Sequence, residues 1–270
     1  MAGECNLVQR LSALRISPNT DAQFWTFTVI ALTWPRRVAA RMLSPLRARH
    51  SELSIISSLD DAPGRPTRGL LDLGLRAATL ALEIDLSHLH DRSAAAQGFL
   101  SVFPGEHYML LAALVECLQP THISEIGTFT GLSALAMLTA LPRGGKLITY
   151  DVTPWDQVEG TALLTSDFED NRLEQRIGDL AAVPYFKANM NDLLSSSLIF
   201  VDGPKDGHFE PTFMRLLSSA KIDHDIVLVF DDIHVWNMLA FWRSLHLPKL
   251  DLTSFGHWSG TGICILSSDH

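Results

Sequence analysis

A glycine turn beside an acidic residue is the first place in this chain where backbone and side chains could bind a ligand. An apolar run at residues 122–127 leads into it, and its defining residues are Glu125, Gly127 and Gly131. Glycines at this spacing allow the backbone to approach a ligand or to pack closely on a sheet. The spacing differs from the dinucleotide pattern G-x-G-x-x-G, because residue 129 is Phe, and no G-K-[ST] phosphate loop is present. The turn therefore disfavours NAD and ATP. It favours a cofactor without a pyrophosphate, whose ammonium group could donate hydrogen bonds to Glu125.

Two further acids lie at the ends of later candidate strands. Asp151 comes 24 residues after Gly127, close to the position where nucleoside-binding sheets place a carboxylate for the ribose hydroxyls. Asp179 follows Gly178 and could contact an adenine. Either acid could instead cap the N-terminus of a helix, a role that Asp performs well. Three acids in register with a glycine turn favour the nucleoside interpretation.

The elements that must position these residues alternate in type from Pro104 onward, as a parallel sheet requires. The predicted strands span residues 122–127, 146–151, 174–179, 198–202 and 225–232. The predicted helices span residues 108–118, a stretch from Leu132, and 236–245, and a hairpin is predicted from residues 253–258 and 261–266 around Ser259 and Gly260. Most of the strands end in an acid. Ligands of open α/β sheets bind at those carboxyl ends, so the acids lie where a ligand is expected.

The first 95 residues have a different character. They read as helical segments with a turn-rich break at residues 60–66, so we expect an accessory region at 1–95 and the main domain at 96–270. The apolar run at 24–34 stops at Pro35 and is shorter than the about 20 residues that a membrane-spanning helix needs. With the arginines at 36–50 it could lie on an anionic membrane surface, or it could pack on the main domain or a second subunit.

Composition narrows the class of partner. The chain has 270 residues, 47% of them hydrophobic, and a formal net charge of -9, which argues against nucleic acid as the main partner and fits a small-molecule substrate better. The three cysteines, Cys5, Cys117 and Cys264, are widely separated and suggest neither a disulfide framework nor a zinc site. We therefore expect a protein of the reducing cytoplasm.

A family resemblance extends these predictions. The stretch 124–136, followed by 141–142 and 145–151, closely resembles the class I S-adenosylmethionine-dependent O-methyltransferases of the caffeoyl-CoA and catechol type. Residues 200–206 resemble the strand-four segment of that family, and 229–232 with Trp236 resemble its strand-five metal segment. The resemblance implies a doubly wound, Rossmann-like sheet of seven strands that ends in an antiparallel hairpin, here with an N-terminal helical extension.

The resemblance also assigns roles to residues around S-adenosylmethionine. It implies that Glu125, Gly127, Thr128, Gly131 and Ser133 form the turn around the methionine part of the cofactor, that Asp151 binds the ribose, and that Gly178, Asp179 and Leu180 flank the adenine. In the family a divalent ion, usually Mg²⁺, is bound by acids that match Asp202, Asp231 and Asp232, and Lys205 matches the candidate general base.

The chain departs from the family at three points. Asp232 replaces an Asn, Gly203 and Pro204 replace bulkier residues, and residues 1–95 have no aligned counterpart. Three facing carboxylates repel one another unless a cation or a shared proton intervenes, so either an ion such as Mg²⁺ is bound or one Asp is turned away. Both alternatives stay open at this point.

Methyl transfer requires an acceptor hydroxyl that is aligned and loses a proton. A bound ion would lower the pKa of the hydroxyl, and Lys205 could take the proton if burial lowered its own pKa. His208 and His234 are alternative bases in the same two loops. The aromatic residues that could wall an acceptor pocket are Phe103, Trp155, Phe168, Trp236 and Trp258.

Two other functions remain compatible with the sequence. A protein of this fold could use the bound sulfonium only as a charge or scaffold for a cyclisation, which would yield an isomer instead of a methylated product. It could also be an inactive scaffold that dimerises through its N-terminal helices. The cluster of acids around Lys205 argues against the inactive scaffold, because neighbouring carboxylates destabilise a fold and an inactive protein would gain nothing from keeping them.

Overall fold

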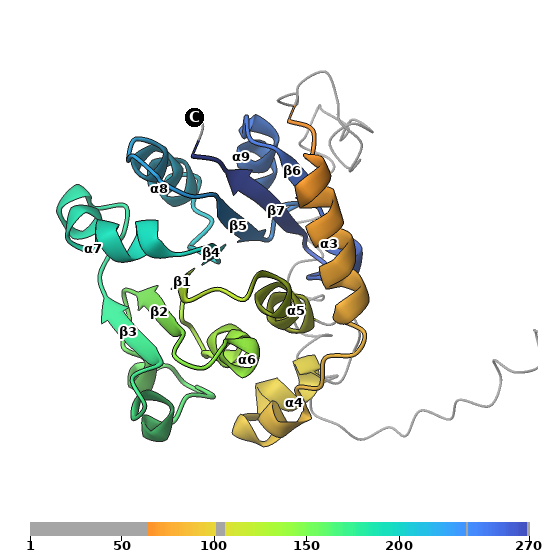
Figure 1. Cartoon of the computed structure of the whole chain (residues 1–270). Coiled ribbons are helices and arrows are strands. Elements are labelled where there is room, and N and C mark those ends of the chain that lie inside the picture. Colours follow the sequence, from red (N-terminus) through yellow and green to blue (C-terminus); the bar gives the residue numbers. More distant parts are fainter. Residues whose placement is uncertain (1–63, 101–105, 236, 269–270) are drawn as a thin grey trace, which may run out of the picture. The chain divides into compact units, whose positions relative to one another are not determined.

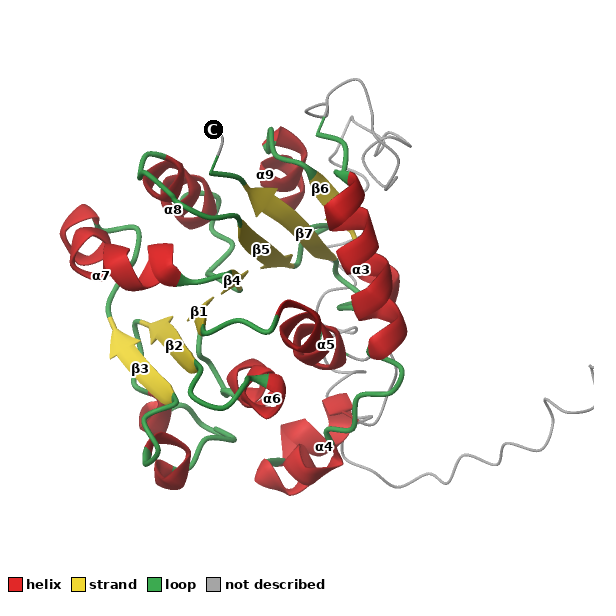
Figure 2. Cartoon of the chain, viewed as in Figure 1, coloured by secondary structure: helices red, strands yellow, loops and turns green. Residues whose placement is uncertain are grey.

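The computed structural model describes residues 64–100, 106–235 and 237–268, which form a seven-stranded sheet with helices on both faces (Figures 1 and 2). The strands are β1 His122–Ile126, β2 Lys146–Asp151, β3 Leu173–Ile177, β4 Leu198–Val201, β5 Ile226–Asp231, β6 Lys249–Asp251 and β7 Thr261–Leu266. The α-helices are α3 Arg68–Leu80, α4 Ala94–Leu100, α5 Tyr108–Leu118, α6 Leu132–Ala140, α7 Val183–Ser195, α8 Phe209–Ser218 and α9 Met238–Ser244.

The sheet is doubly wound, as the sequence predicts. Its strand order is β3-β2-β1-β4-β5-β7-β6, in which β1 to β5 are parallel and β7 runs antiparallel to β5 and β6. The chain moves outward from β1 to β3 and then returns to the other side of β1 with β4. The carboxyl ends of β1 and β4 therefore flank the topological switch point, where open α/β sheets bind their ligands.

The apolar side chains of the strands point alternately into two hydrophobic cores. On β5, Val227 and Val229 belong to one core, while Leu228 and Phe230 belong to the other. Helices α3, α5 and α6 cover the first face of the sheet, and α7, α8 and α9 cover the second (Figure 1). A sheet buried on both faces explains why β4 and β5 are nearly continuous apolar runs.

The predicted hairpin exists, but its first strand is residues 249–251 and not the predicted 253–258. The partner of β7 is β6, with Leu250 opposite Ile263, and residues 253–255 form a short 3-10 helix instead of a strand. The cause is local: Oδ1 of Asp251 accepts hydrogen bonds from the backbone N–H and the hydroxyl of Thr253, at 2.9 and 2.6 Å. This side chain-to-backbone turn ends the strand at Asp251. The loop that follows carries His257 back over the end of the sheet.

Helix α3 belongs to the region predicted as accessory. The hydroxyl of Thr67 caps it by accepting a hydrogen bond from the backbone N–H of Leu70 at 3.1 Å. Leu70 is fully buried in the same core as α5. Gly74 lies so close to β6 that a Cβ there would come within 2.6 Å of Cδ2 of Leu250. The division of the chain at residue 95 stays a prediction.

The segments proposed for a membrane surface or a dimer contact, residues 24–50, lie outside the described residues, as does the turn-rich break up to residue 63. Within the described part of the chain, no helix combines the length and the apolar character that crossing a bilayer would take.

Candidate active site

The glycine turn lies between the ends of β1, β2 and β4. The N–H of Gly127 donates to the carbonyl of Tyr150 at 2.8 Å, and the N–H of Asp202 donates to the carbonyl of Ile126 at 2.8 Å. Gly127 has a φ of +96°, and a Cβ at this position would collide with the carbonyl oxygen of Asp202. Only glycine fits here, because the left-handed backbone and the missing side chain are both required.

Asp151 holds the turn from β2. Its Oδ2 accepts hydrogen bonds from the backbone N–H groups of Thr128 and Phe129 at 2.9 and 3.0 Å, and its Oδ1 accepts from the N–H of Thr153 at 2.9 Å. A carboxylate oxygen has two lone pairs, so Oδ1 of Asp151 can still accept one hydrogen bond from a ligand, while Oδ2 already accepts two. The structure thus assigns Asp151 a local role that the sequence did not suggest, in addition to a place on the cavity wall.

Glu125 lies beneath the turn with no exposed surface, and neither of its carboxylate oxygens has a hydrogen-bond partner within the described chain. Burial is the largest influence and raises the pKa of Glu125 to about 7, although the hydroxyls of Ser133 and Thr149 act in the opposite direction. An unsatisfied buried carboxyl group is costly unless a donor completes it, which makes Glu125 a candidate acceptor for a ligand.

A cavity of about 830 Å³ extends along the carboxyl ends of the parallel strands. The predicted cofactor residues that line it are Gly127, Asp151, Gly178, Asp179 and Leu180. Glu125, Thr128, Gly131 and Ser133 are in or beside the same turn but are not among the lining residues. Oδ1 of Asp179 also accepts the N–H of Ala181 at 2.7 Å, so this acid stabilises the turn before α7 as well.

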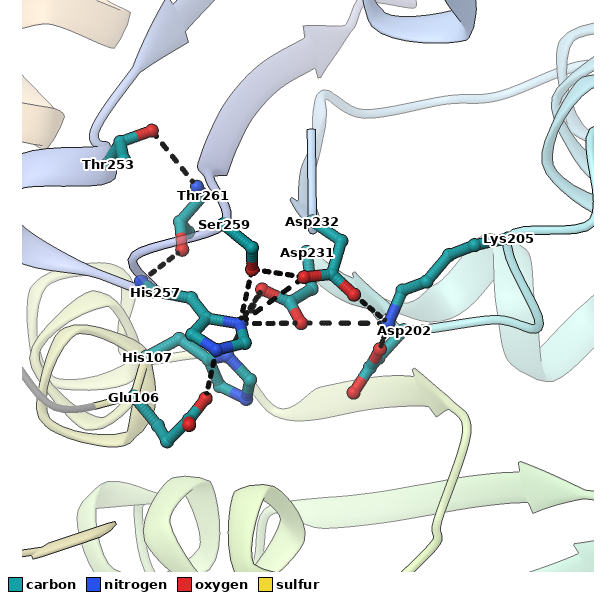
Figure 3. A network of polar contacts seen from close by, with 10 residues as sticks. All are labelled: Glu106, His107, Asp202, Lys205, Asp231, Asp232, Thr253, His257, Ser259 and Thr261. Carbon is teal, nitrogen blue, oxygen red and sulfur yellow. Dashed lines mark hydrogen bonds and ion pairs between the residues drawn. The ribbon is translucent and has the colours of Figure 1, made fainter. Parts of the chain in front are cut away.

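Next to the glycine turn in the same cavity, Asp202, Asp231 and Asp232 converge on the ammonium group of Lys205 (Figure 3). The Nζ of Lys205 donates to Oδ1 of Asp202, lies 2.6 Å from Oδ2 of Asp232 and 3.7 Å from Oδ2 of Asp231. Lys205 and Asp232 have φ values of +56° and +58°, which are strained for residues other than glycine. Such strain gathers at functional sites, where the surrounding structure holds it in place.

The pKa of Lys205 is not lowered, so the condition under which Lys205 could act as the base is not met. Burial acts to lower that pKa, but Asp202, Asp232 and Asp231 outweigh it, and the pKa of Lys205 is raised above its ordinary value. Lys205 is therefore a firmly protonated cation in this arrangement. The pKa of Asp202 is also raised, because the group is buried and faces the charge of Asp231.

Three residues that sequence reasoning missed complete the cluster: Glu106, His107 and His257 (Figure 3). His257 lies between two carboxylates, with Nε2 at 2.7 Å from Oε2 of Glu106 and Nδ1 at 3.2 Å from both oxygens of Asp231. Nδ1 of the buried His107 lies 3.3 Å from Oδ1 of Asp231. Burial disfavours a charge on either ring, but the carboxylates outweigh it, so the pKa of His107 is raised and that of His257 is raised to about 10.

Of the two histidines suggested as alternative bases, only His208 lines the cavity. His208 lines the cavity just before α8. His234 lies elsewhere, with Nε2 at 2.6 Å from Oδ2 of Asp251, and is not among the lining residues.

The aromatic lining differs from the expected one. Trp155 and Phe168 stack on each other with ring centroids 5.3 Å apart and pack against the first core, while Trp258 is 76% exposed. Phe103 and Trp236 lie outside the described residues. The aromatic residues that line the cavity are Phe99, Tyr108, Phe129, Tyr150 and Phe209.

Comparison with known proteins gives one matching family model, described as O-methyltransferase, over residues 86–237. Curated relatives include the caffeoyl-CoA O-methyltransferase of Medicago sativa, 28% identical over 130 residues that cover 47% of this chain and 50% of that protein. The caffeoyl-CoA O-methyltransferase 1 of Nicotiana tabacum is 29% identical over 130 residues, or 47% of this chain and 52% of that protein. The chain thus spans about half the length of the curated relatives it matches.

Among solved structures, the O-methyltransferase from Bacillus cereus in complex with SAH is 16% identical, covers 75% of this chain and 92% of that one, and has a TM-score of 0.44. The SAH-bound methyltransferase from Podospora anserina is 16% identical, with 73% and 88% of the two chains covered and a TM-score of 0.42.

Proposed function

Because the chain belongs to the O-methyltransferase family, we propose that it transfers the methyl group of S-adenosylmethionine to a hydroxyl oxygen of a small molecule. One observation carries the proposal: a single cavity connects the glycine turn and Asp151 with the polar cluster around Lys205 and His257. A methyl donor at the first end and an acceptor at the second would meet inside that cavity, near Asp202.

The residues at the first end fit the cofactor. Gly127 lets the turn pack directly on the carbonyl oxygen of Asp202, where a side chain would collide, and Glu125 offers two buried oxygens without partners. We assign Glu125, with Gly127, Thr128, Gly131 and Ser133, to the methionine part, Asp151 to the ribose, and Gly178, Asp179 and Leu180 to the adenine. When bound, S-adenosylmethionine supplies an electrophilic methyl group on a sulfonium centre.

The second end fits an acceptor hydroxyl. The side chain of Lys205 is only 12% exposed, so its positive charge acts in a poorly solvated place and favours the ionised form of a hydroxyl beside it. Asp202 lines the cavity next to the glycine turn, and its raised pKa makes it a better proton acceptor than an ordinary carboxylate. We therefore keep Asp202 and Lys205 as the candidate catalytic pair, with Lys205 as the cation and not as the base.

The divalent ion that the resemblance implies does not fit the side chains as they stand. The carboxylates of Asp202, Asp231 and Asp232, which the resemblance assigns to the ion, all contact the ammonium group of Lys205, with Nζ no more than 3.7 Å from each of them. No step of the proposed reaction is assigned to a metal.

Calorimetry with S-adenosylhomocysteine tests the cofactor proposal. We expect saturable binding by the wild type and at least about tenfold weaker binding by Asp151→Asn, since one lost charged hydrogen bond costs about 1.5 kcal/mol or more. Asp156→Asn is the control, because Asp156 is exposed shortly after the same strand and does not line the cavity. No binding by the wild type, or equal binding by Asp151→Asn, would rule the proposal out.

Once an acceptor is known, the mass of the product tests the reaction itself. Methyl transfer increases the mass of the acceptor by one methylene unit, whereas an isomer of the acceptor would indicate cyclisation.

Three further features stay proposals on sequence grounds. Residues 1–95 act as an accessory region that forms a lid or a dimer contact, the protein is a homodimer, and it works in the cytoplasm on a small-molecule acceptor. Light scattering of the purified chain checks the dimer directly.

A further inference from the structure

The carboxylate cluster at the ends of β4 and β5 already contains a cation of its own. The ammonium group of Lys205 contacts Asp202 and lies 2.6 Å from Oδ2 of Asp232 and 3.7 Å from Oδ2 of Asp231. Mg²⁺ requires oxygen ligands at about 2.0–2.1 Å in nearly ideal octahedral geometry. The ion and the ammonium group would compete for the same three carboxylates, and both cannot be accommodated.

Oxygens of Asp231 and Asp232 are engaged by further side chains as well. Oδ1 of Asp232 accepts a hydrogen bond from the hydroxyl of Ser259, which is itself buried. Asp231 lies between His107 and His257, whose Nδ1 atoms are 3.3 and 3.2 Å from its Oδ1. A divalent ion bound by Asp231 and Asp232 would therefore have to displace the ammonium group of Lys205 and the hydroxyl of Ser259, although His257 lies close enough to these two acids to be a further ligand.

Side chains of the protein offset most of the negative charge of the cluster without an ion. Four carboxylates face one another in the cluster, namely Glu106, Asp202, Asp231 and Asp232, and three nitrogen groups oppose them, namely Lys205, His107 and His257. Buried carboxylates need positive charge or hydrogen-bond donors to offset the loss of solvent. Side chains of the protein supply both.

The backbone holds Lys205 in this position. Its N–H donates to Oε1 of Glu210 at 2.9 Å, and Glu210 is only 1% exposed. Nδ2 of Asn237 donates to the carbonyl of Lys205 at 3.4 Å. The strained φ of +56° at Lys205 persists because these contacts fix the loop, so the lysine is built into the cluster and is not a mobile surface side chain.

We infer that Lys205 takes the place of the divalent ion, so that the cluster binds no divalent cation and the reaction needs none. This inference rests on the proposed methyl transfer for its catalytic part, but not for the statement about ion binding. Asp232, where the family has an Asn, gives this ammonium group a charged acceptor at 2.6 Å, which is a stronger partner than the oxygen of an amide.

Titration with Mn²⁺, followed by electron paramagnetic resonance, tests ion binding directly, because Mn²⁺ suits carboxylate ligands and free and bound Mn²⁺ give different signals. We expect no saturable binding by the wild type. Lys205→Met removes the ammonium group and leaves the carboxylates uncompensated, so its affinity for Mn²⁺ should exceed that of the wild type by at least about tenfold. Lys146→Met is the matched control, because Lys146 is also ion-paired, with Glu174, but lies far along the sheet at the start of β2. It should bind no more Mn²⁺ than the wild type.

Stoichiometric, tight Mn²⁺ binding by the wild type would overturn the inference, and so would a folded Lys205→Met variant that gains no affinity. Lys205→Arg keeps the charge and must exclude Mn²⁺ as the wild type does. If Lys205→Met fails to fold, the wild type and Lys205→Arg still decide the question. The outcome is independent of the proposed function. A protein that excludes Mn²⁺ but does not bind S-adenosylhomocysteine would contradict only the proposed function, and a protein that binds both would contradict only this inference.

Discussion

At the scale of single residues, Gly127 combines two requirements that can be separated by mutation. Its φ of +96° disfavours any side chain, and its Cα faces the carbonyl oxygen of Asp202. Gly144 has a similar φ of +82° but open space around it, so Gly144→Ala measures the backbone strain alone. We expect Gly144→Ala to cost about 1 kcal/mol of the free energy of unfolding and Gly127→Ala to cost more than about 2 kcal/mol. Chemical denaturation measures both. Equal losses would show that the collision at Gly127 is relieved.

Glu125 links stability to pH. The pKa of its carboxyl group is about 7 in the folded protein, whereas the ordinary value of 4.5 applies to the unfolded chain. The folded state therefore binds the proton more tightly than the unfolded state. The free energy of unfolding therefore falls as the pH rises from 4.5 to about 7, and the loss persists above that pH. Glu125→Gln removes this penalty. The variant should be more stable than the wild type at pH 8, by an amount on the order of 3 kcal/mol, with a smaller gain at pH 5.

Glu174 provides the opposite control for that measurement. Arg176 is the main cause that lowers the pKa of Glu174, so its charge stabilises the folded state above its ordinary pKa of 4.5. Glu174→Gln should be less stable than the wild type at pH 8. If Glu125→Gln instead loses stability at pH 8, an unrecognised partner holds the Glu125 carboxylate in its charged form.

The sequence predicts the site residues that belong to a local pattern and misses those that do not. Gly127, Asp151 and Asp202 follow strands, so their types and positions predicted that they would share the cavity wall, as they do. His107 and His257 meet across 150 residues in loops without any metal-ligand or catalytic spacing. The only available signal was their position, before a predicted helix and inside a predicted hairpin at the active edge of the sheet.

At the scale of elements, the sequence predicts the bounds of the parallel strands within about two residues. The signal is clearest for β4 and β5, which are buried on both faces and are nearly continuous apolar segments. The hairpin was harder. Its first strand, β6, has only three residues and precedes a turn fixed by Asp251, while the loop at 253–258 resembles a strand in composition. Short edge strands depend on tertiary pairing more than on local propensity.

Helix α3 allows a test of the predicted division into an accessory region and a main domain. Leu70 is fully buried against the core of the sheet, whereas Leu75 on the same helix is 56% exposed. Leu70→Ala should lower the free energy of unfolding of the whole described fold by about 2–5 kcal/mol, since it leaves a cavity in a shared core. Leu75→Ala should change it by less than about 0.5 kcal/mol.

The reporter for this comparison must lie outside α3. Hydrogen exchange of amides in β4 and β5 serves this purpose, because these strands form the centre of the sheet. Slower or unchanged exchange there in Leu70→Ala would indicate that α3 folds as a separate unit.

At the scale of the whole molecule, the site exists only when distant segments are assembled. Glu106 precedes α5, the glycine turn follows β1, Lys205 follows β4 and His257 precedes β7. A ligand that binds this cavity therefore binds the folded state alone, and its free energy of binding adds to the stability of the fold. At a hundredfold excess over its Kd, S-adenosylhomocysteine should raise the free energy of unfolding by about 2.7 kcal/mol.

This increment should be the same in the wild type and in Leu70→Ala, because Leu70 is remote from the lining of the cavity and changes only the stability of the unliganded fold. It should shrink in Asp151→Asn at the same ligand concentration, because that substitution weakens binding itself. Thermal denaturation with and without ligand measures all three. An increment that also shrinks in Leu70→Ala at a saturating concentration would mean that α3 contributes to cofactor binding, which would make the region predicted as accessory a part of the catalytic unit.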